Sequence, residues 1–216
     1  IYLAWQQQEE LLRNILENSR TVAMQYSPNN AIPYVSIVDA GTVELIRGFG
    51  VEVVSSADLV GRFEAHLSME DWESHKEAGR IMQEIKDTTF AEIAKRIRNG
   101  EHPKEFEIQA FMHDLMREQE MTWEDGPIVA VNEHAADPHF EPTPENSFAM
   151  KQGDLVLIDL WAKKNRPGSI YYDVTWMGFI GTDIPETLQN IFSIAVKARN
   201  AALNLVKDRF KSDTPV

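Results

Sequence analysis

Residues 153–176 read GDLVLIDLWAKKNRPGSIYYDVTW, two apolar runs separated by a short polar segment. Each run is rich in β-branched and aromatic residues, and Asn165-Arg166-Pro167-Gly168 between them is typical of a turn. We therefore expect an antiparallel hairpin of strands 154–162 and 171–180. Asp159 interrupts the first apolar run and Asp173 lies in the second, so that the two carboxylates fall near the same level of the hairpin.

The Asp159 and Asp173 side chains have two interpretations. Two carboxylates held close together repel each other, and a divalent cation between them removes the repulsion. Alternatively, each Asp is an end-of-strand or turn residue whose carboxylate accepts backbone hydrogen bonds. Asp154, directly after Gly153, is expected to begin the strand rather than to bind a ligand.

Two histidines lie in the segment NEHAADPHF, residues 132–140, which is expected to form a loop after a strand at 128–131. His134 and His139 are five residues apart and do not form the i, i+4 metal pair of a helix. One imidazole beside the two aspartates would suit a general acid or a hydrogen-bond donor, since it titrates near neutral pH. The alternative is a histidine exposed to solvent. The other histidines are expected at the surface: His66, His75, His102 and His113.

The rest of the chain predicts an α+β protein. The spacing of apolar residues predicts a helix over 1–25, and a βαβ-like unit with strands 34–38 and 51–54 around a helix at 41–47. A boundary is expected near 60–68. Beyond it we expect a long helix from Ser68 to Asn99-Gly100, a second helix from Pro103, the strands given above, and a last helix from Asp183 to about Phe210.

Composition excludes several classes of partner and site. The 216 residues carry a net charge of −13, which disfavours nucleic acid and anionic membranes as partners. With no Cys, the chain can form neither disulfides nor thiolate metal sites, and any metal must bind Asp, Glu, His or water. The same lack of Cys agrees with a cytoplasmic protein.

These motifs together resemble the pita-bread metallopeptidases, the family of creatinases, prolidases and Xaa-Pro aminopeptidases. The segments Gly153–Asp159 and Tyr172–Thr175 are similar to the paired-aspartate signature of that family, and Asn132 with His139-Phe140 resembles the motif before it. The resemblance implies that Asp159 binds one of two divalent metal ions and that Asp173 bridges both. It also implies that His139 contacts the substrate, with Thr175 and Asn132 supporting the site.

The implied reaction is hydrolysis of Xaa-Pro peptide bonds, with manganese, or else cobalt or zinc, as the metal. Residues 1–64 would be the remnant of an N-terminal α/β domain, and residues 65–216 the first half of a pita-bread catalytic domain. The remaining family ligands have no match after Asp173, so we expect a truncated chain that is inactive alone. An uncovered apolar face would make it self-associate, forming a homo-oligomer such as a dimer.

The same resemblance leaves other functions open. Trp176 stands where many family peptidases have Arg, which would alter the substrate pocket. The fold also hosts a creatine amidinohydrolase and lyases that act on small molecules. A third possibility is a binding module that keeps the fold without metal chemistry.

Overall fold

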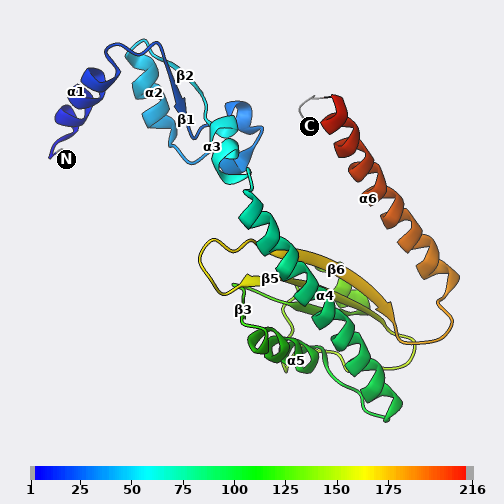
Figure 1. Cartoon of the computed structure of the whole chain (residues 1–216). Coiled ribbons are helices and arrows are strands. Elements are labelled where there is room, and N and C mark those ends of the chain that lie inside the picture. The colour runs from blue at the N-terminus through cyan, green and yellow to red at the C-terminus, as the bar shows by residue number, and fades with distance from the viewer. Residues whose placement is uncertain (1–2, 213–216) are drawn as a thin grey trace. The chain divides into compact units, whose positions relative to one another are not determined.

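The computed structural model describes residues 3–212, and it divides into two compact units at Met69/Glu70 (Figure 1). The first unit contains the βαβ arrangement. The second contains the antiparallel sheet with the two aspartates. Interpreting the first unit as a domain remnant stays a prediction.

The first unit is built around two parallel strands, β1 (Thr21–Met24) and β2 (Glu52–Ser55), joined through helix α2 (Ala40–Gly48). Helix α1 (Trp5–Leu16) precedes them and α3 (Ala57–Glu64) follows. Val22 and Met24 of β1 pack against a small core formed by Val43, Ile46, Val51 and Val53.

Two predictions for this unit were wrong. The first helix ends at Leu16 instead of continuing to residue 25, because Thr21–Met24 pairs with β2. The expected strand at 34–38 is absent, since Pro33 begins a 3₁₀ turn, Pro33–Val35, that follows another at Pro28–Asn30. Proline fixes φ near −65° and lacks an amide hydrogen, which suits the first position of such a turn. The βαβ unit therefore exists, but its first strand lies earlier in the chain.

The second unit begins with a long helix, α4 (Met69–Arg98), followed by α5 (Glu105–Glu118). The predicted stop of α4 at Asn99-Gly100 is confirmed: Gly100 adopts φ +81°, and the amide of Glu101 bonds back to the carbonyl of Arg96 at 3.0 Å. This is the left-handed helix end for which glycine is preferred. Pro103 lies just before α5 rather than in its first turn.

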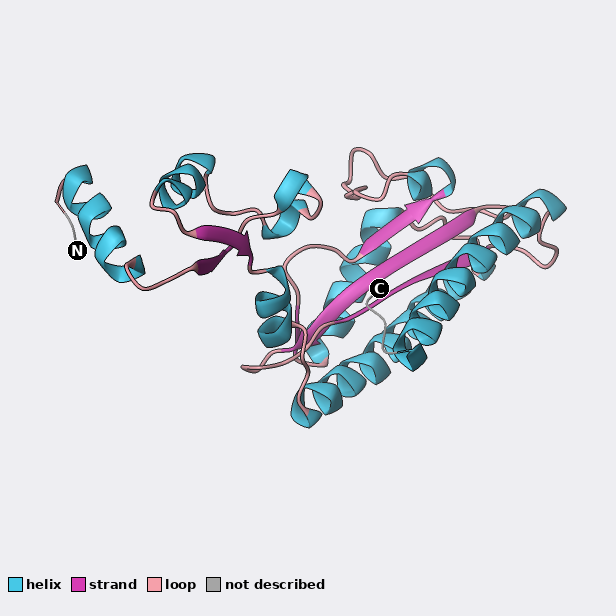
Figure 2. Cartoon of the chain, turned by 90° about the horizontal axis from the view of Figure 1, so that it is seen from above, coloured by secondary structure: helices cyan, strands magenta, loops and turns pink. Residues whose placement is uncertain are grey.

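The sheet of this unit is antiparallel, with β5 (Leu155–Lys164) at its centre (Figure 2). β6 (Tyr172–Phe179) pairs with one edge of β5; β4 (Ile128–Val131) and the two-residue β3 (Met121–Thr122) pair with its other edge. The predicted hairpin is therefore confirmed. β3 was missed because two residues are too few to show a period.

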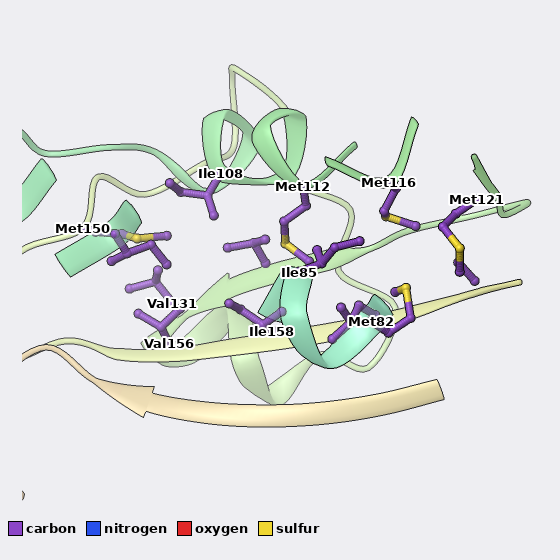
Figure 3. Close-up of a cluster of buried hydrophobic side chains, with 14 of the residues drawn as sticks. Met82, Ile85, Ile108, Met112, Met116, Met121, Val131, Met150, Val156 and Ile158 are labelled. Carbon is purple, nitrogen blue, oxygen red and sulfur yellow. The ribbon is translucent and has the colours of Figure 1, made fainter. Parts of the chain in front are cut away.

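One face of the sheet is covered by α4 and α5. Their side chains and the alternate residues Val156, Ile158 and Leu160 of β5 form one apolar core, in which methionines fill much of the space between the elements (Figure 3). The fully buried methionines are Met82, Met112, Met116 and Met150. Because successive residues of a strand face opposite sides, the residues between these β5 positions, Asp159 included, face away from the helices.

The last helix, α6 (Glu186–Ser212), follows β6 and leaves large apolar side chains exposed, among them Ile191, Ile194 and Phe210. Within residues 3–212, none of the helices has the length and apolar character needed to cross a bilayer. Helices followed by antiparallel strands confirm the α+β class.

Candidate functional site

The face of the sheet opposite α4 and α5 carries both aspartates. In the register of the hairpin, Asp159 of β5 lies opposite Thr175 of β6, and Asp173 lies two residues from Thr175. All three side chains therefore lie on one face, with the two aspartates as diagonal neighbours, roughly 7–8 Å apart along the sheet. The predicted juxtaposition of Asp159 and Asp173 is present.

Hydrogen bonding around the pair is sparse. The Thr175 hydroxyl donates to Asp159 Oδ1 at 2.6 Å, which orients that carboxylate. Among the described residues, neither Asp159 nor Asp173 forms an ion pair with Lys or Arg. Although Asp173 reaches solvent, the surrounding protein desolvates its carboxyl and raises its pKa, and the negative charge of Asp159 raises that pKa further.

The two carboxylates suit a hard divalent cation, because they offer oxygen atoms and carry negative charge that lacks a cationic partner. Their mutual repulsion is the effect that such a cation removes. No cluster of three or more His, Asp and Glu side chains suited to a metal occurs in residues 3–212. The described donor set therefore fits a metal but amounts to part of a site.

Asn132 fixes the strand that carries Asp159. It follows β4 and has a left-handed backbone, with φ +52°. Its side-chain nitrogen Nδ2 donates to Asp154 Oδ1, and its side-chain oxygen Oδ1 accepts from the backbone amide of Leu155, both at 2.9 Å. The other oxygen of the buried Asp154 accepts from the Lys151 amide at 2.8 Å. Asp154 thus holds the start of β5, as predicted, and Asn132 acts on the backbone.

His139 lies in an exposed turn, where its backbone amide donates to Asp137 Oδ1 at 2.9 Å. The next residue, Phe140, is buried and packs in one cluster with Ile128, Leu157 and Trp161. Leu157 and Trp161 flank Asp159 on the same face of β5, and Ile128 lies opposite Asp159 in the register. Phe140 therefore anchors the turn containing His139 on the face that carries the aspartates.

His134 is neither exposed nor beside the aspartates. Its Nδ1 is 2.9 Å from Oε1 of Glu105, the first residue of α5, and its ring stacks on Phe140 and Phe148. This role of Glu105 could not be predicted from the sequence, since an acidic residue in the first turn of a helix is common. It became visible only when α5 and the loop after β4 were brought together.

The remaining histidines divide into two groups. His66 and His102 are exposed, as expected. His75 and His113 are half-buried instead, and their rings bond to the carbonyls of Tyr171 at 2.7 Å and of Gly126 at 2.8 Å. The His102 ring also bonds to a carbonyl, that of Met150 at 3.0 Å, although His102 is exposed. The rings of His75 and His113 connect α4 and α5 to the ends of neighbouring segments.

Trp176 does not line the aspartate face. It lies opposite Ile158, on the helix-covered side of the sheet, and Nζ of Lys86 from α4 is 4.0 Å from the centre of its ring. Because Trp176 and Thr175 are consecutive residues of a strand, they face opposite ways, and Trp176 is not on the face of the aspartates. Its expected effect on a substrate pocket stays a prediction.

Comparison with known proteins gives one family and one fold. Residues 73–213 match the family described as metallopeptidase family M24. No curated protein matches the sequence of this chain.

Solved structures resemble the chain at low identity. The prolidase from Pyrococcus horikoshii OT3 is 21% identical with a TM-score of 0.58, over 90% of this chain and 50% of that one. The prolidase from Pyrococcus furiosus is 19% identical with a TM-score of 0.56, over 92% and 52%. The X-Pro aminopeptidase from Thermotoga maritima MSB8 is 20% identical with a TM-score of 0.52, over 89% and 49%. The chain therefore spans about half the length of these proteins and shares their fold.

Proposed function

The chain belongs to metallopeptidase family M24, and on this premise we propose that Asp159 and Asp173 contribute to a dinuclear metal site that hydrolyses Xaa-Pro peptide bonds. The observation that carries the proposal is the pair itself: two carboxylates on one face of a hairpin, without a cationic partner in residues 3–212. The substrate class rests on the likeness to prolidases and an X-Pro aminopeptidase.

Each residue has a distinct role in this proposal. Asp159 would hold one divalent cation and Asp173 would be shared between two, while the Thr175 hydroxyl, which donates to Asp159, would keep that carboxylate oriented for the metal. Asn132 holds the first residue of β5 in place and in this way positions Asp159 along the strand. His139, on the turn anchored by Phe140, contacts the substrate and donates a hydrogen bond.

A bound divalent cation supplies Lewis-acid activation of water and polarisation of the scissile carbonyl. Manganese is the metal we favour, with cobalt or zinc as alternatives, because the donors are carboxylate oxygens. Activity belongs to the whole protein, and we expect residues 1–216 to hydrolyse little by themselves.

The first test measures Mn²⁺ binding to the chain by electron paramagnetic resonance, at Mn²⁺ concentrations into the millimolar range. We expect binding that is lost in Asp159→Asn and in Asp173→Asn. Asp114→Asn is the matched control, since it removes the same charge from an exposed position on α5. Equal Mn²⁺ binding by all four proteins would refute the metal role of the pair.

The second test compares substrates in the presence of Mn²⁺. Ala-Pro and Gly-Pro dipeptides, longer peptides with proline at the second position, and creatine are supplied to the whole protein. Cleavage of the proline peptides, abolished by Asp173→Asn, is expected. If the protein turned over creatine and none of the proline peptides, the proposed peptidase activity would be wrong and the protein would be a small-molecule amidinohydrolase.

We also propose that the chain forms a homo-oligomer, a dimer being the simplest. The exposed apolar residues of α6 support this, since contiguous apolar surface is a frequent mark of association. A monodisperse monomer in light scattering at micromolar concentration would contradict it.

A cytoplasmic location is part of the proposed function and rests on the absence of Cys.

A further inference from the structure

We propose that Glu105 is a positioning residue for the loop that carries His139, acting through His134 and Phe140. The part of this inference that concerns His139 in catalysis rests on the proposed function. The part that concerns the loop rests on the contacts of Glu105, His134 and Phe140 alone.

Glu105 is fully buried, with 0% of its surface exposed, although it carries a carboxylate. Its Oε1 accepts from the amide of Val131 at 2.6 Å, at the end of β4, and its Oε2 accepts from the amide of Phe148 at 2.7 Å. A carboxylate buried in this way is stable only when donors surround it. Glu105 therefore joins the start of α5 to segments on both sides of the His139 turn.

The third donor to Glu105 is His134. Its Nδ1 lies 2.9 Å from Oε1 and 3.0 Å from Oε2, and because a carboxylate only accepts, that nitrogen carries the hydrogen. The imidazole is stacked between two rings, with centroid distances of 4.1 Å to Phe140 and 3.9 Å to Phe148. The hydrogen bond fixes the plane of the imidazole, and that plane fixes the Phe140 ring.

Phe140 connects the His134 ring with the face of the sheet that carries the aspartates. It is the residue after His139, and it packs with Ile128, Leu157 and Trp161 on the face of the sheet that carries Asp159. Its amide bonds to the Asp137 carbonyl at 3.2 Å, and the Asp137 amide bonds to the His134 carbonyl at 3.1 Å. The turn from His134 to Phe140 is thus closed at both of its ends by residues that depend on Glu105.

The test measures amide hydrogen exchange by NMR in the unaltered chain and in Glu105→Gln. Gln keeps the shape but turns one acceptor into a donor, which then faces a backbone N–H. We expect the amides of Asp137, His139 and Phe140, none of which bonds to Glu105, to exchange about tenfold to a hundredfold faster. Glu118→Gln, at the exposed end of the same helix, is the matched control and should exchange as the unaltered chain does.

Global destabilisation is separated by the amide of Ile93, which lies inside α4 and is buried in the core, where exchange requires global unfolding. If Ile93 and the turn accelerate equally, Glu105 only stabilises the fold and the proposal is wrong. If neither accelerates, the proposal is also wrong. Faster exchange confined to the turn supports it.

Two substitutions of His134 separate the hydrogen bond from the stacking. His134→Asn keeps a nitrogen donor near the position of Nδ1 and removes the ring, whereas His134→Phe keeps the ring and removes the donor. We expect both substitutions to lose most of the protection of the turn, because Glu105 reaches Phe140 only through a side chain that has both the donor and the ring. Protection retained in His134→Phe would show that stacking alone orders the loop, and protection retained in His134→Asn would show that Phe140 is not positioned through the imidazole. Either result would overturn the role of Glu105.

A last measurement connects the loop with the site. Millimolar Mn²⁺ should broaden the imidazole C–H resonance of His139 in the unaltered chain, and less so in Glu105→Gln. Absence of broadening in the unaltered chain would count against the proposed function, while hydrogen exchange would still decide the role of Glu105. Equal broadening in both proteins would show that Glu105 does not position His139.

Discussion

Two carboxylate centres in this chain contrast in almost every respect. Glu105 is completely buried and its oxygens accept from two backbone amides and from His134. Asp159 is half-buried and Asp173 is exposed on the other face of the sheet, and the hydroxyl of Thr175 donates to Asp159. The first centre has its donors within the protein. The second has an excess of negative charge that the described residues leave uncompensated.

The number of protein donors around a carboxylate separates the structural centre from the proposed functional centre better than burial does. A buried carboxylate whose two oxygens already accept from protein donors is costly to remove and is poorly placed to bind a ligand. A partly solvated pair of anions costs some stability and gains most from a cation supplied from outside. Changes at the two centres should therefore have opposite effects on stability, and the following predictions test that difference.

The largest effect is expected from Glu105→Ala. Two backbone amides and His134 would lose a buried acceptor, so the free energy of unfolding should fall by about 3 kcal/mol or more. Urea denaturation followed by circular dichroism measures this change, with Glu118→Ala as the exposed control. A loss below about 1 kcal/mol would mean that water replaces the carboxylate and that the centre is not structural.

Mn²⁺ should stabilise the chain through the other centre. At a free concentration ten times the dissociation constant, the gain in unfolding free energy is about 1.4 kcal/mol. It should disappear in the double variant Asp159→Asn/Asp173→Asn and persist in Glu118→Gln. Thermal unfolding with and without Mn²⁺ provides the measurement, and equal gains in the double variant would place the metal elsewhere.

Without metal, Asp173→Asn should stabilise the chain slightly, by less than about 1 kcal/mol, because it removes a repulsion between exposed charges. The sign is opposite to that expected at Glu105. Urea denaturation in the presence of a chelator measures it. A destabilisation would show that the Asp173 carboxylate accepts hydrogen bonds that matter to the fold.

The smallest effect is the pH dependence of that difference. Since the pKa of Asp173 is raised in the folded chain, first by desolvation and then by Asp159, folding favours its protonated form. The stability from this group is therefore present at low pH and is lost as pH rises through the folded pKa. The advantage of Asp173→Asn over the unaltered chain should shrink when unfolding is measured at pH 5 instead of pH 7. An advantage that grows on acidification would contradict the direction of the shift.

The local elements of the second unit could be predicted because their signals are local. The turn Asn165 to Gly168 between two apolar runs specified the hairpin, and Asn99-Gly100 specified the end of α4. The first unit was predicted less well. The helical period of residues 1–25 continued into Thr21–Met24, and only pairing with β2 makes that segment a strand.

Candidate site residues could be named from sequence, but their surroundings could not. The alternation of a strand predicts that Asp159 and Asp173 share a face, whereas the partners of His134 come from α5 and from residue 148. Such contacts depend on how distant segments pack, and no periodic pattern records them. The roles given to Asp159, Asp173, Thr175, Asn132 and His139 remain proposals.

The sequence by itself determined the antiparallel hairpin, the two helices before it, and the placing of two aspartates on neighbouring strands, because each follows from a period or a turn within a few residues. The tertiary structure alone decided that Glu105 is buried, that His134 is its partner, and that Trp176 belongs to the helix-covered face. The physical reason is that burial and hydrogen bonding are properties of packed surfaces. A carboxylate becomes structural or functional according to which segments the fold brings around it.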